Sequence, residues 1–589
     1  MGVYGWIWTR AGDKGRKWLE WGLAGLVAGV SLASVLTHEP WADELHTWLQ
    51  ARDLSVGELW LEMAYEGHFL PWHLILHPFA SLGAPVETMG WISWIINAAT
   101  VAWFARKAPL GGGAKAAVAL SCVFLYVNPA ISRCYVLVPP VLFGLAALWG
   151  KRDERPLAFG MLVALLANTH VCMAGPALLA FSVFAWTNVF RREDGETWRE
   201  CGKQWAGLGV MVAGFAVAVA QILPCLWKSS VEPGNISDRS QCLAWMCQGC
   251  MPSPVGWAVA AGLAWLGVEA WRRDRGVFVV YAGSLAFLAG FALFVYPAAV
   301  VNRALLWWPV AIGTGWALED RRRGAEAQWN GGVCVAVAVT GLGLARPDMT
   351  WRDWREAFDP LPVACRAIVE EYGWDGEVWM DGAESRTEGA AAYLDHPMDW
   401  RTGRRAERIR WVAGRRDEGL AFRECLEEIF RRHPGKECLW VLGTLGGGGE
   451  GVSISDLTAP GVSVEFLSRR AICPWSGGVV VAKVSRDGFE KGAEKGEDRS
   501  RMLEALARLV RLDEGQWEAM NNLAWLCAEE GRVEEAREWM NRAMANEEAR
   551  KSASVWDTEA AVRRAEGDEA GAREAERRRD ELRAGEDGK

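Results

Sequence analysis

An excess of basic residues is missing from this 589-residue sequence, which carries 64 Lys+Arg against 73 Asp+Glu and has a net charge of −9. A nucleic-acid-binding surface needs Lys and Arg gathered on one face, whereas the basic residues of the apolar part occur in small groups between apolar runs. The apolar runs themselves are almost free of charge, and a transporter for a lipid-linked substrate needs ionisable groups inside its spans. The sequence therefore disfavours both a nucleic-acid partner and transport.

A cleavage site for a signal peptide is also missing. Residues 10–37 combine a basic flank with an apolar run, but no clean small-x-small site precedes His38. We interpret this run as a retained membrane helix.

What the chain does contain is two regions of opposite character. Up to Ala345 there are 25 Lys+Arg and 23 Asp+Glu, whereas Arg346 to Lys589 hold 39 and 50. The first region has eleven apolar runs of roughly 17 to 22 residues, the length that a helix needs to cross a bilayer. The predicted spans are 18–37, 87–105, 114–131, 134–150, 157–172, 173–190, 205–226, 253–271, 277–296, 303–318 and 329–345.

Lys and Arg alternate between the connections of these spans. The N-terminal flank and every second loop hold 20 of them, and the other loops hold 5. Because Lys and Arg stay on the cytoplasmic side during insertion, we expect a cytoplasmic N-terminus and an extracytoplasmic region after residue 346. The prediction is a polytopic α-helical membrane protein with a transmembrane domain at 1–346, whose first outer loop is 38–86.

The outer region divides into two predicted parts. Residues 347–498 alternate helical patterns (351–372, 384–394, 417–434) with strand patterns (377–380, 438–442, 462–467, 478–484), which indicates a small α/β domain. Its run Gly446 to Gly451 formally matches G-x-G-x-x-G, but no helix pattern follows, so a flexible loop is favoured over a phosphate site.

Residues 499–589 are predicted to be helical. Leu523, Ala524, Cys527, Gly531, Ala536, Met540 and Ala543 occupy the packing positions of one tetratricopeptide-like helix pair, and a degenerate second copy follows around Trp556 and Gly567. Two such units are few for a peptide-binding superhelix. A helical cap, a dimer contact and a protein partner all remain open for this segment.

The first outer loop holds five of the eight His residues together with several acids. Asp43 and Glu44 follow Pro40-Trp41-Ala42 at an expected helix start, where two acids stabilise the helix dipole. An acid just outside the first membrane helix is also where a general base facing a lipid-borne substrate would lie. Both interpretations stay open for this pair.

Metal sites are incomplete in the sequence. His73 and His77 lie at i and i+4 and would need His68 or Glu66 to bind a metal, but interfacial His beside apolar residues more often anchor a helix in the membrane surface. Cys242, Cys247 and Cys250 share an outer loop without a fourth zinc ligand, although a disulfide is chemically permitted there. We predict no metal site; the sequence requires no cofactor and leaves a divalent cation open.

Two isolated cations lie at the outer ends of predicted spans. Arg133 and Arg303 are explained either by snorkelling to the interface or by phosphate binding, for which the forked, permanently charged guanidinium is suited. His170 is expected at the same membrane surface. An acid, several bases and two cations on one surface suit the transfer of a sugar from a polyprenyl-phosphate carrier.

At these residues the first 345 positions resemble the bacterial GT-C superfamily of membrane glycosyltransferases, which includes protein O-mannosyltransferases and aminoarabinose transferases, and they are most similar to a largely uncharacterised branch. The resemblance rests on Asp43-Glu44 with Trp48-Leu49-x-Ala51-Arg52-Asp53, Tyr65-Glu66-Gly67-His68 with Trp72-His73-Leu74, Arg133-x-Tyr135, Asn168-Thr169-His170, and Tyr296-Pro297 before Arg303.

The resemblance implies a sugar transfer on the outer face of the bacterial inner membrane. A polyprenyl-phosphate sugar would be the donor, and a lipid, glycan or protein hydroxyl the acceptor. Asp43 would act as the base, with Glu44 orienting it or sharing the role, and Arg303 and Arg133 would neutralise the departing lipid phosphate. His68, His73, His170 and Tyr135 complete the expected substrate-binding set. The alternative is a non-catalytic membrane scaffold that binds envelope proteins through its outer α/β and helical regions.

Overall fold

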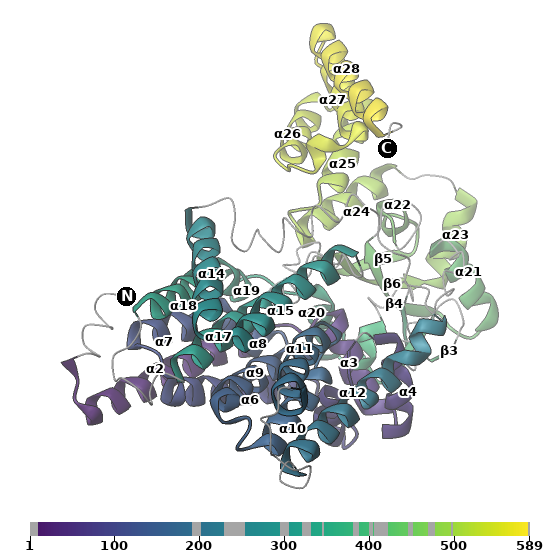
Figure 1. Cartoon of the computed structure of the whole chain (residues 1–589). Coiled ribbons are helices and arrows are strands. Elements are labelled where there is room, and N and C mark those ends of the chain that lie inside the picture. Colours follow the sequence, from purple (N-terminus) through teal and green to yellow (C-terminus); the bar gives the residue numbers. More distant parts are fainter. Residues whose placement is uncertain are drawn as a thin grey trace. The chain divides into compact units, whose positions relative to one another are not determined.

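The computed structural model describes residues 10–66, 68–190, 202–228, 254–294, 306–320, 331–343, 347–380, 388–399, 404–405, 422–445, 452–468, 478–495 and 499–586. The described part of the chain is 76% helical and has one small mixed sheet (Figure 1). Its contacts divide it into two compact units. The first contains residues 1–40, 47–355 and 410–415, and the second contains residues 41–46, 356–409 and 416–589.

Helices build the first unit. Helical structure occupies each of the eleven runs that the sequence predicts as spans. The main elements are α2 (Asp13–Thr37), α6 (Thr88–Lys107), α7 (Gly112–Ala119), η1 (Val123–Val127), α8 (Asn128–Ala130), η2 (Cys134–Leu137), α9 (Val138–Leu148), η3 (Trp149–Lys151), α10 (Pro156–Ala167), η4 (Val171–Met173), α11 (Ala174–Ala185), η5 (Trp186–Phe190), α12 (Gly202–Lys228), α14 (Pro254–Arg273), α15 (Arg275–Phe294), α17 (Trp307–Asp320), α18 (Gly331–Gly343) and α19 (Pro347–Asp353).

Five helical segments of the described chain are long and apolar enough to cross a membrane: Asp13–Thr37, Cys134–Lys151, Val171–Asn188, Gly202–Leu223 and Arg275–Ala292. A sixth is obtained if the bent pair Gly112–Ala119 and Val123–Ala130 is one span. Pro156–Ala167 and Gly331–Gly341 are apolar but shorter. The helices fit a multi-pass membrane protein, and the full count of eleven crossings stays a prediction.

Ends of successive helices gather at two places in the first unit. At one end, Lys115 donates to Glu20 at 2.7 Å, and Arg106 lies 3.7 Å from the same carboxylate. Further contacts join other basic connections to one another: Asn188 with Asp153, Trp149 with Asp274, and Arg273 with Glu319. All of these belong to the connections that the sequence predicts to share the cytoplasmic side.

The opposite end joins the connections that the sequence predicts to be outside. His38, after α2, pairs with Asp353 at 3.1 Å, and both side chains are buried. Nearby, Trp354 donates to Ser34 Oγ, which itself reaches the carbonyl of Leu125. The orientation of the helices in a membrane stays a prediction.

The run predicted as one helix at 114–131 is broken. Its two halves differ in direction by 48°, and the second half begins with π-helix η1. A π-helical turn leaves carbonyls without their usual helical donors, and such turns often coincide with kinks. Asn97 of α6 donates to the carbonyl of Phe124, and Ser34 of α2 donates to that of Leu125. Polar side chains from two neighbouring helices thus satisfy the bend inside an apolar environment.

Small residues bring α10 and α12 into close contact. A Cβ on Gly214 would lie 2.3 Å from that of Ala164, and one on Gly160 would lie 2.5 Å from the carbonyl oxygen of Gly207. Helices in membranes associate closely through such small residues. The seam ends at Asn168, which donates to the carbonyls of Ala164 and Gly214.

The predicted first outer loop contains three helices: α3 (Ala42–Asp53), α4 (Val56–Glu66) and α5 (Pro71–Ala80). Leu54, Leu59, Met63 and Leu70 form a small buried cluster among them. Pro71 occupies the first turn of α5, where its missing N–H costs nothing. The loop is therefore an ordered platform for the candidate site.

The second unit has a six-stranded sheet of order β3-β2-β1-β4-β6-β5. The strands are β1 (Val378–Met380), β2 (Pro397–Asp399), β3 (Arg404–Arg405), β4 (Cys438–Leu445), β5 (Val462–Ser468) and β6 (Gly478–Ser485). β1 pairs in parallel with β2 and β4, and the other neighbours are antiparallel. The four predicted strand runs are confirmed, and the two short strands β2 and β3 were not predicted.

Helices of this unit are shorter than the sequence pattern predicts. The expected helix at 351–372 is divided into α19, α20 (Pro360–Arg366) and η7 (Ala367–Glu371), because Asp359 caps a new helix that starts at Pro360. The expected helix at 384–394 is η8 (Glu388–Ala392) in its described part. The remaining elements are α21 (Phe422–Arg432), α22 (Ile454–Leu457), α23 (Arg486–Lys495), α24 (Arg499–Leu512), α25 (Trp517–Glu529), α26 (Val533–Met544), η9 (Ala549–Lys551), α27 (Ala553–Ala565) and α28 (Glu569–Glu586).

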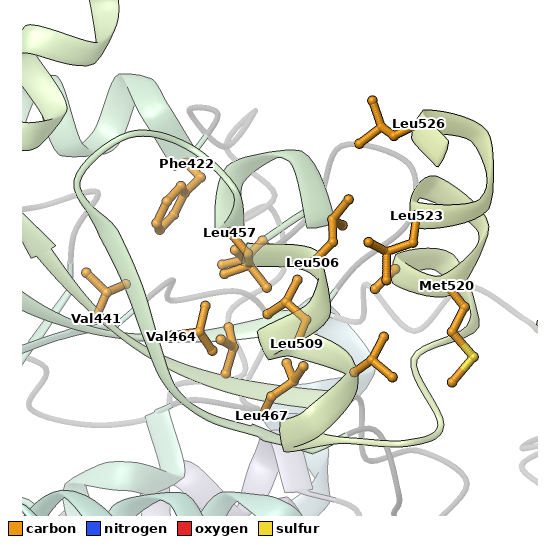
Figure 2. Close-up of a cluster of buried hydrophobic side chains, with 14 of the residues drawn as sticks. Phe422, Val441, Leu457, Val464, Leu467, Leu506, Leu509, Met520, Leu523 and Leu526 are labelled. Carbon is orange, nitrogen blue, oxygen red and sulfur yellow. The ribbon is translucent and has the colours of Figure 1, made fainter. Parts of the chain in front are cut away.

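One hydrophobic core joins the sheet to the C-terminal helices. Figure 2 shows Val464 and Leu467 of β5 facing Leu506 and Leu509 of α24, with Leu523 of α25 beyond them. The turns between α25 and α26 and between α27 and α28 hold Gly531 and Gly567 at φ 74° and 82°, a conformation that favours glycine. The helices after residue 499 thus pack onto the α/β part, and the predicted three-domain division stays a prediction.

Candidate functional site

Arg133 is the central charge of the candidate site. It stands directly after α8 and before η2, in the short turn that follows Pro129, and its side chain is buried. One guanidinium nitrogen donates to Thr47 Oγ1 of α3 at 3.3 Å, and the other lies 3.0 Å from His68 Nε2. Both contacts fix the position of the guanidinium between α3 and His68, which follows α4.

The hydrogen bonds of His68 assign its tautomer. Nδ1 lies 2.7 Å from the carbonyl oxygen of Glu66, which only accepts, so this nitrogen carries the proton. Nε2 of the neutral ring then accepts from Arg133. Because a protonated His68 would place a second positive charge against Arg133, this arrangement favours the neutral ring.

His170 lies beside His68. The two residues form an isolated antiparallel bridge, and their ring centroids are 5.1 Å apart. The amide of Cys172 donates to His170 Nδ1 at 3.0 Å, so the ring proton of a neutral His170 lies on Nε2, which is 3.4 Å from the Tyr135 hydroxyl. The structure therefore brings four predicted site residues together: Arg133, His68, His170 and Tyr135.

His73 belongs to a second polar chain in the same loop. Gln50 of α3 donates to the carboxylate of Glu66 at 2.7 Å, which fixes its amide orientation. Its oxygen then accepts from His73 Nε2 at 3.0 Å. Glu66 is the link between the two groups, because its carbonyl binds His68 and its carboxylate binds Gln50. Gln50 was not predicted, and no sequence pattern marks it.

Gln221 fixes the start of α5. Its amide nitrogen donates to Asn168 Oδ1 at 3.0 Å, and its oxygen accepts from the backbone of Leu70 at 3.0 Å. Asn168 immediately precedes Thr169 and His170 in the chain. The seam between α10 and α12 therefore positions both His170 and the helix that carries His73. Gln221 was not predicted, although a lone Gln in an otherwise apolar span is a signal that could have found it.

Asp43 and Glu44 lie in the first turn of α3, which is grouped with the second unit. Glu44 is buried, and its carboxylate accepts from the backbone N–H of Trp41 at 3.2 Å. This is one half of a capping box, so Glu44 has the helix-start role that the sequence left open. Asp43 is only partly buried. The helical repeat places it on the same face of α3 as Thr47, four residues later.

Several predicted residues lie outside the described part of the chain. They are Arg303 with Tyr296 and Pro297, the three Cys of the loop at 242–250, and the Gly-rich run 446–451. Within the described residues, no group of three His, Cys, Asp or Glu could hold a metal ion. His77, part of the metal alternative, directs Nδ1 to the carbonyl of Ala51 at 2.8 Å.

The site combines a buried cation with neutral imidazoles and a phenol. A buried guanidinium stabilises a phosphate more strongly than an exposed one, because little water screens it. The imidazole and phenol groups supply hydrogen bonds without adding charge. This arrangement suits recognition of an anionic group beside a neutral polar one.

No protein-family model matches the chain, and a search of curated proteins finds no significant match.

Proposed function

We propose that the protein is a membrane glycosyltransferase that moves a sugar from a polyprenyl-phosphate donor to an acceptor hydroxyl. The observation that carries the proposal is the buried contact of Arg133 with His68, beside His170 and Tyr135. Arg133 supplies a fixed positive charge at those helix ends that the distribution of Lys and Arg among the loops predicts to lie on the outer face. Eleven crossings, a cytoplasmic N-terminus and a GT-C-like fold in the bacterial inner membrane are part of the same proposal.

Asp43 is the proposed base. Its carboxylate would take the proton of the acceptor hydroxyl while that oxygen forms a bond to the anomeric carbon. The bond from this carbon to the phosphate oxygen breaks, and its electron pair leaves with the polyprenyl phosphate. Glu44 would keep the first turn of α3 in place, since it caps that turn.

Arg133 is the proposed partner of the departing phosphate. The charge on the bridging phosphate oxygen grows as its bond to the sugar breaks, so a fixed cation stabilises the transition state more than the ground state. Arg303 is proposed for the same role from the sequence alone. His68, His73, His170 and Tyr135 would hold the phosphate and the sugar hydroxyls.

Sugar transfer in membrane vesicles tests the assignment. Vesicles are given a radiolabelled nucleotide sugar, so that the labelled lipid donor forms in place, and the label in the acceptor fraction is counted. Asp43→Asn should lower transfer about 100-fold or more, the usual contribution of a general base. Arg133→Gln should lower it about 100-fold, as for the loss of one oxyanion donor.

Matched controls come from the same helix. Asp53 and Arg52 form a pair at 2.7 Å at the end of α3, so Asp53→Asn and Arg52→Gln should leave transfer within about twofold of wild type, since exposed pairs contribute little. Transfer that survives both Asp43→Asn and Arg133→Gln would contradict the catalytic assignment and favour a scaffold that binds envelope proteins.

A further inference from the structure

A cavity of about 320 Å³ lies in the second unit, between the end of β4, α22 and the first turns of α25 and α27. Its lining mixes apolar residues, among them Ile454 and Trp517, with polar ones, among them Asn521, Asn522, Ser554 and Glu518. The cavity thus has the mixed lining of a binding site for an amphipathic small molecule.

The two asparagines are the second observation. Asn521 is only 6% exposed, and its Oδ1 is buried without a hydrogen-bond partner among the described residues. Buried amide oxygens are normally paired, so an unpaired one in a cavity wall indicates a missing donor. The neighbouring Asn522 is exposed. Met520 and Leu523 of the same helix point into the core (Figure 2), so α25 divides its surface between core and cavity.

Charge and size restrict the occupant. Among the described residues that line the cavity, Glu518 carries a carboxylate and none carries a positive charge, which favours a neutral ligand over an anion. The volume lies at the lower end of the range for small-molecule sites. It suits one or two sugar rings, which combine an apolar C–H face with a rim of hydroxyls that donate and accept.

We infer that this cavity binds a neutral sugar residue of a glycan. The carbohydrate places its apolar face against the Trp517 and Ile454 side, and its hydroxyls donate to Asn521 Oδ1 and exchange hydrogen bonds with Asn522 and Ser554. Binding here is independent of transfer at the membrane unit. If the proposed function also holds, the acceptor is a glycan.

Saturation-transfer difference NMR on the full-length protein tests the inference. The protein is placed in lipid nanodiscs, because alkyl-glycoside detergents would present sugars to the cavity. The probes are methyl β-glucoside, methyl α-mannoside, chitobiose, glucuronate and the capped peptide acetyl-Ala-Asn-Ser-Ala-amide. At least one neutral probe should receive saturation with millimolar affinity, and glucuronate should bind at least tenfold more weakly because of Glu518.

Variants assign the signal to the cavity. Asn521→Leu should weaken the bound glycoside at least tenfold, and Asn522→Ala, at an exposed position that does not affect folding, should weaken it several-fold. Asn541→Leu, on the exposed face of α26, is the control and should bind as wild type. The inference is overturned if no neutral glycoside binds, if both cavity variants bind as wild type, or if only the peptide binds. Since no donor lipid is needed, a failure here is separate from a failure of the transfer assay.

Discussion

The seam between α10 and α12 gives the most quantitative prediction, the effect of Gly214→Ala. The new Cβ would lie 2.3 Å from Ala164 Cβ and 2.7 Å from Ala164 Cα. Non-bonded carbons are comfortable at about 3.5–4.0 Å, so the helices must separate by about 1 Å or more. Overpacking of this kind costs roughly 1–3 kcal/mol, and the better helix propensity of Ala returns about 1 kcal/mol. We expect a net loss of up to about 2 kcal/mol.

The assay is thermal unfolding of the purified protein in detergent, followed by tryptophan emission. Gly209→Ala is the matched control, because it lies on the same helix with nothing within 4 Å of its Cβ, and it should be neutral or slightly stabilising. Adding Ala164→Gly to Gly214→Ala should restore part of the stability, since it removes the closest contact and leaves the one to Cα. A Gly214→Ala protein as stable as Gly209→Ala would refute the close seam.

Three further predictions concern buried groups. Lys115→Met should lower the free energy of unfolding by about 3–5 kcal/mol, and with it the melting temperature, because Glu20 would stay buried without its nearest cation. Adding Glu20→Gln should recover part of that loss. Arg537→Met should lower the free energy of unfolding of the C-terminal helices by about 2 kcal/mol, measured by chemical unfolding. The loss is smaller than for a fully buried pair, because Glu559 is buried but Arg537 is partly exposed. Burial raises the pKa of the Cys365 thiol, so this residue should resist iodoacetamide at pH 8.5 until the protein is unfolded. The thiol of the unfolded chain loses its proton at a lower pH than the buried thiol, so Cys365 lowers the stability of the fold as the pH rises above the unfolded pKa near 8.5. Mass spectrometry of the labelled peptide checks the protection of Cys365 from iodoacetamide.

Helix positions were the part of the fold that the sequence predicted well, because apolar run length is read directly from the chain. What it missed was backbone geometry that depends on neighbours. The bend at residues 120–122 is stabilised by Asn97 and Ser34, which lie in other helices, and no local pattern reveals that contact. The short strands β2 and β3 have two or three residues each, too few for a periodicity signal.

The candidate site was predicted in composition but not in arrangement. Loop position and residue type were enough to select Arg133, His68 and His170, because charged and polar groups at span ends are few. The partners that orient them, Gln50 and Gln221, come from distant segments and carry no motif. Glu44 shows the opposite case, since its dipole and capping role could be read from its place at the helix start.

Donor cleavage by the purified protein is the most direct test of the proposed function. The protein in nanodiscs is mixed with polyprenyl-phosphate sugars extracted from membranes and with membrane glycans as acceptors, and released polyprenyl phosphate is measured by mass spectrometry. We predict release by the wild-type protein and by Asp53→Asn, with a loss of about 100-fold or more for Asp43→Asn. The account is contradicted if the wild-type protein and Asp43→Asn release equal amounts of polyprenyl phosphate. It is also contradicted if neither the wild-type protein nor Asp53→Asn releases polyprenyl phosphate from any extracted donor.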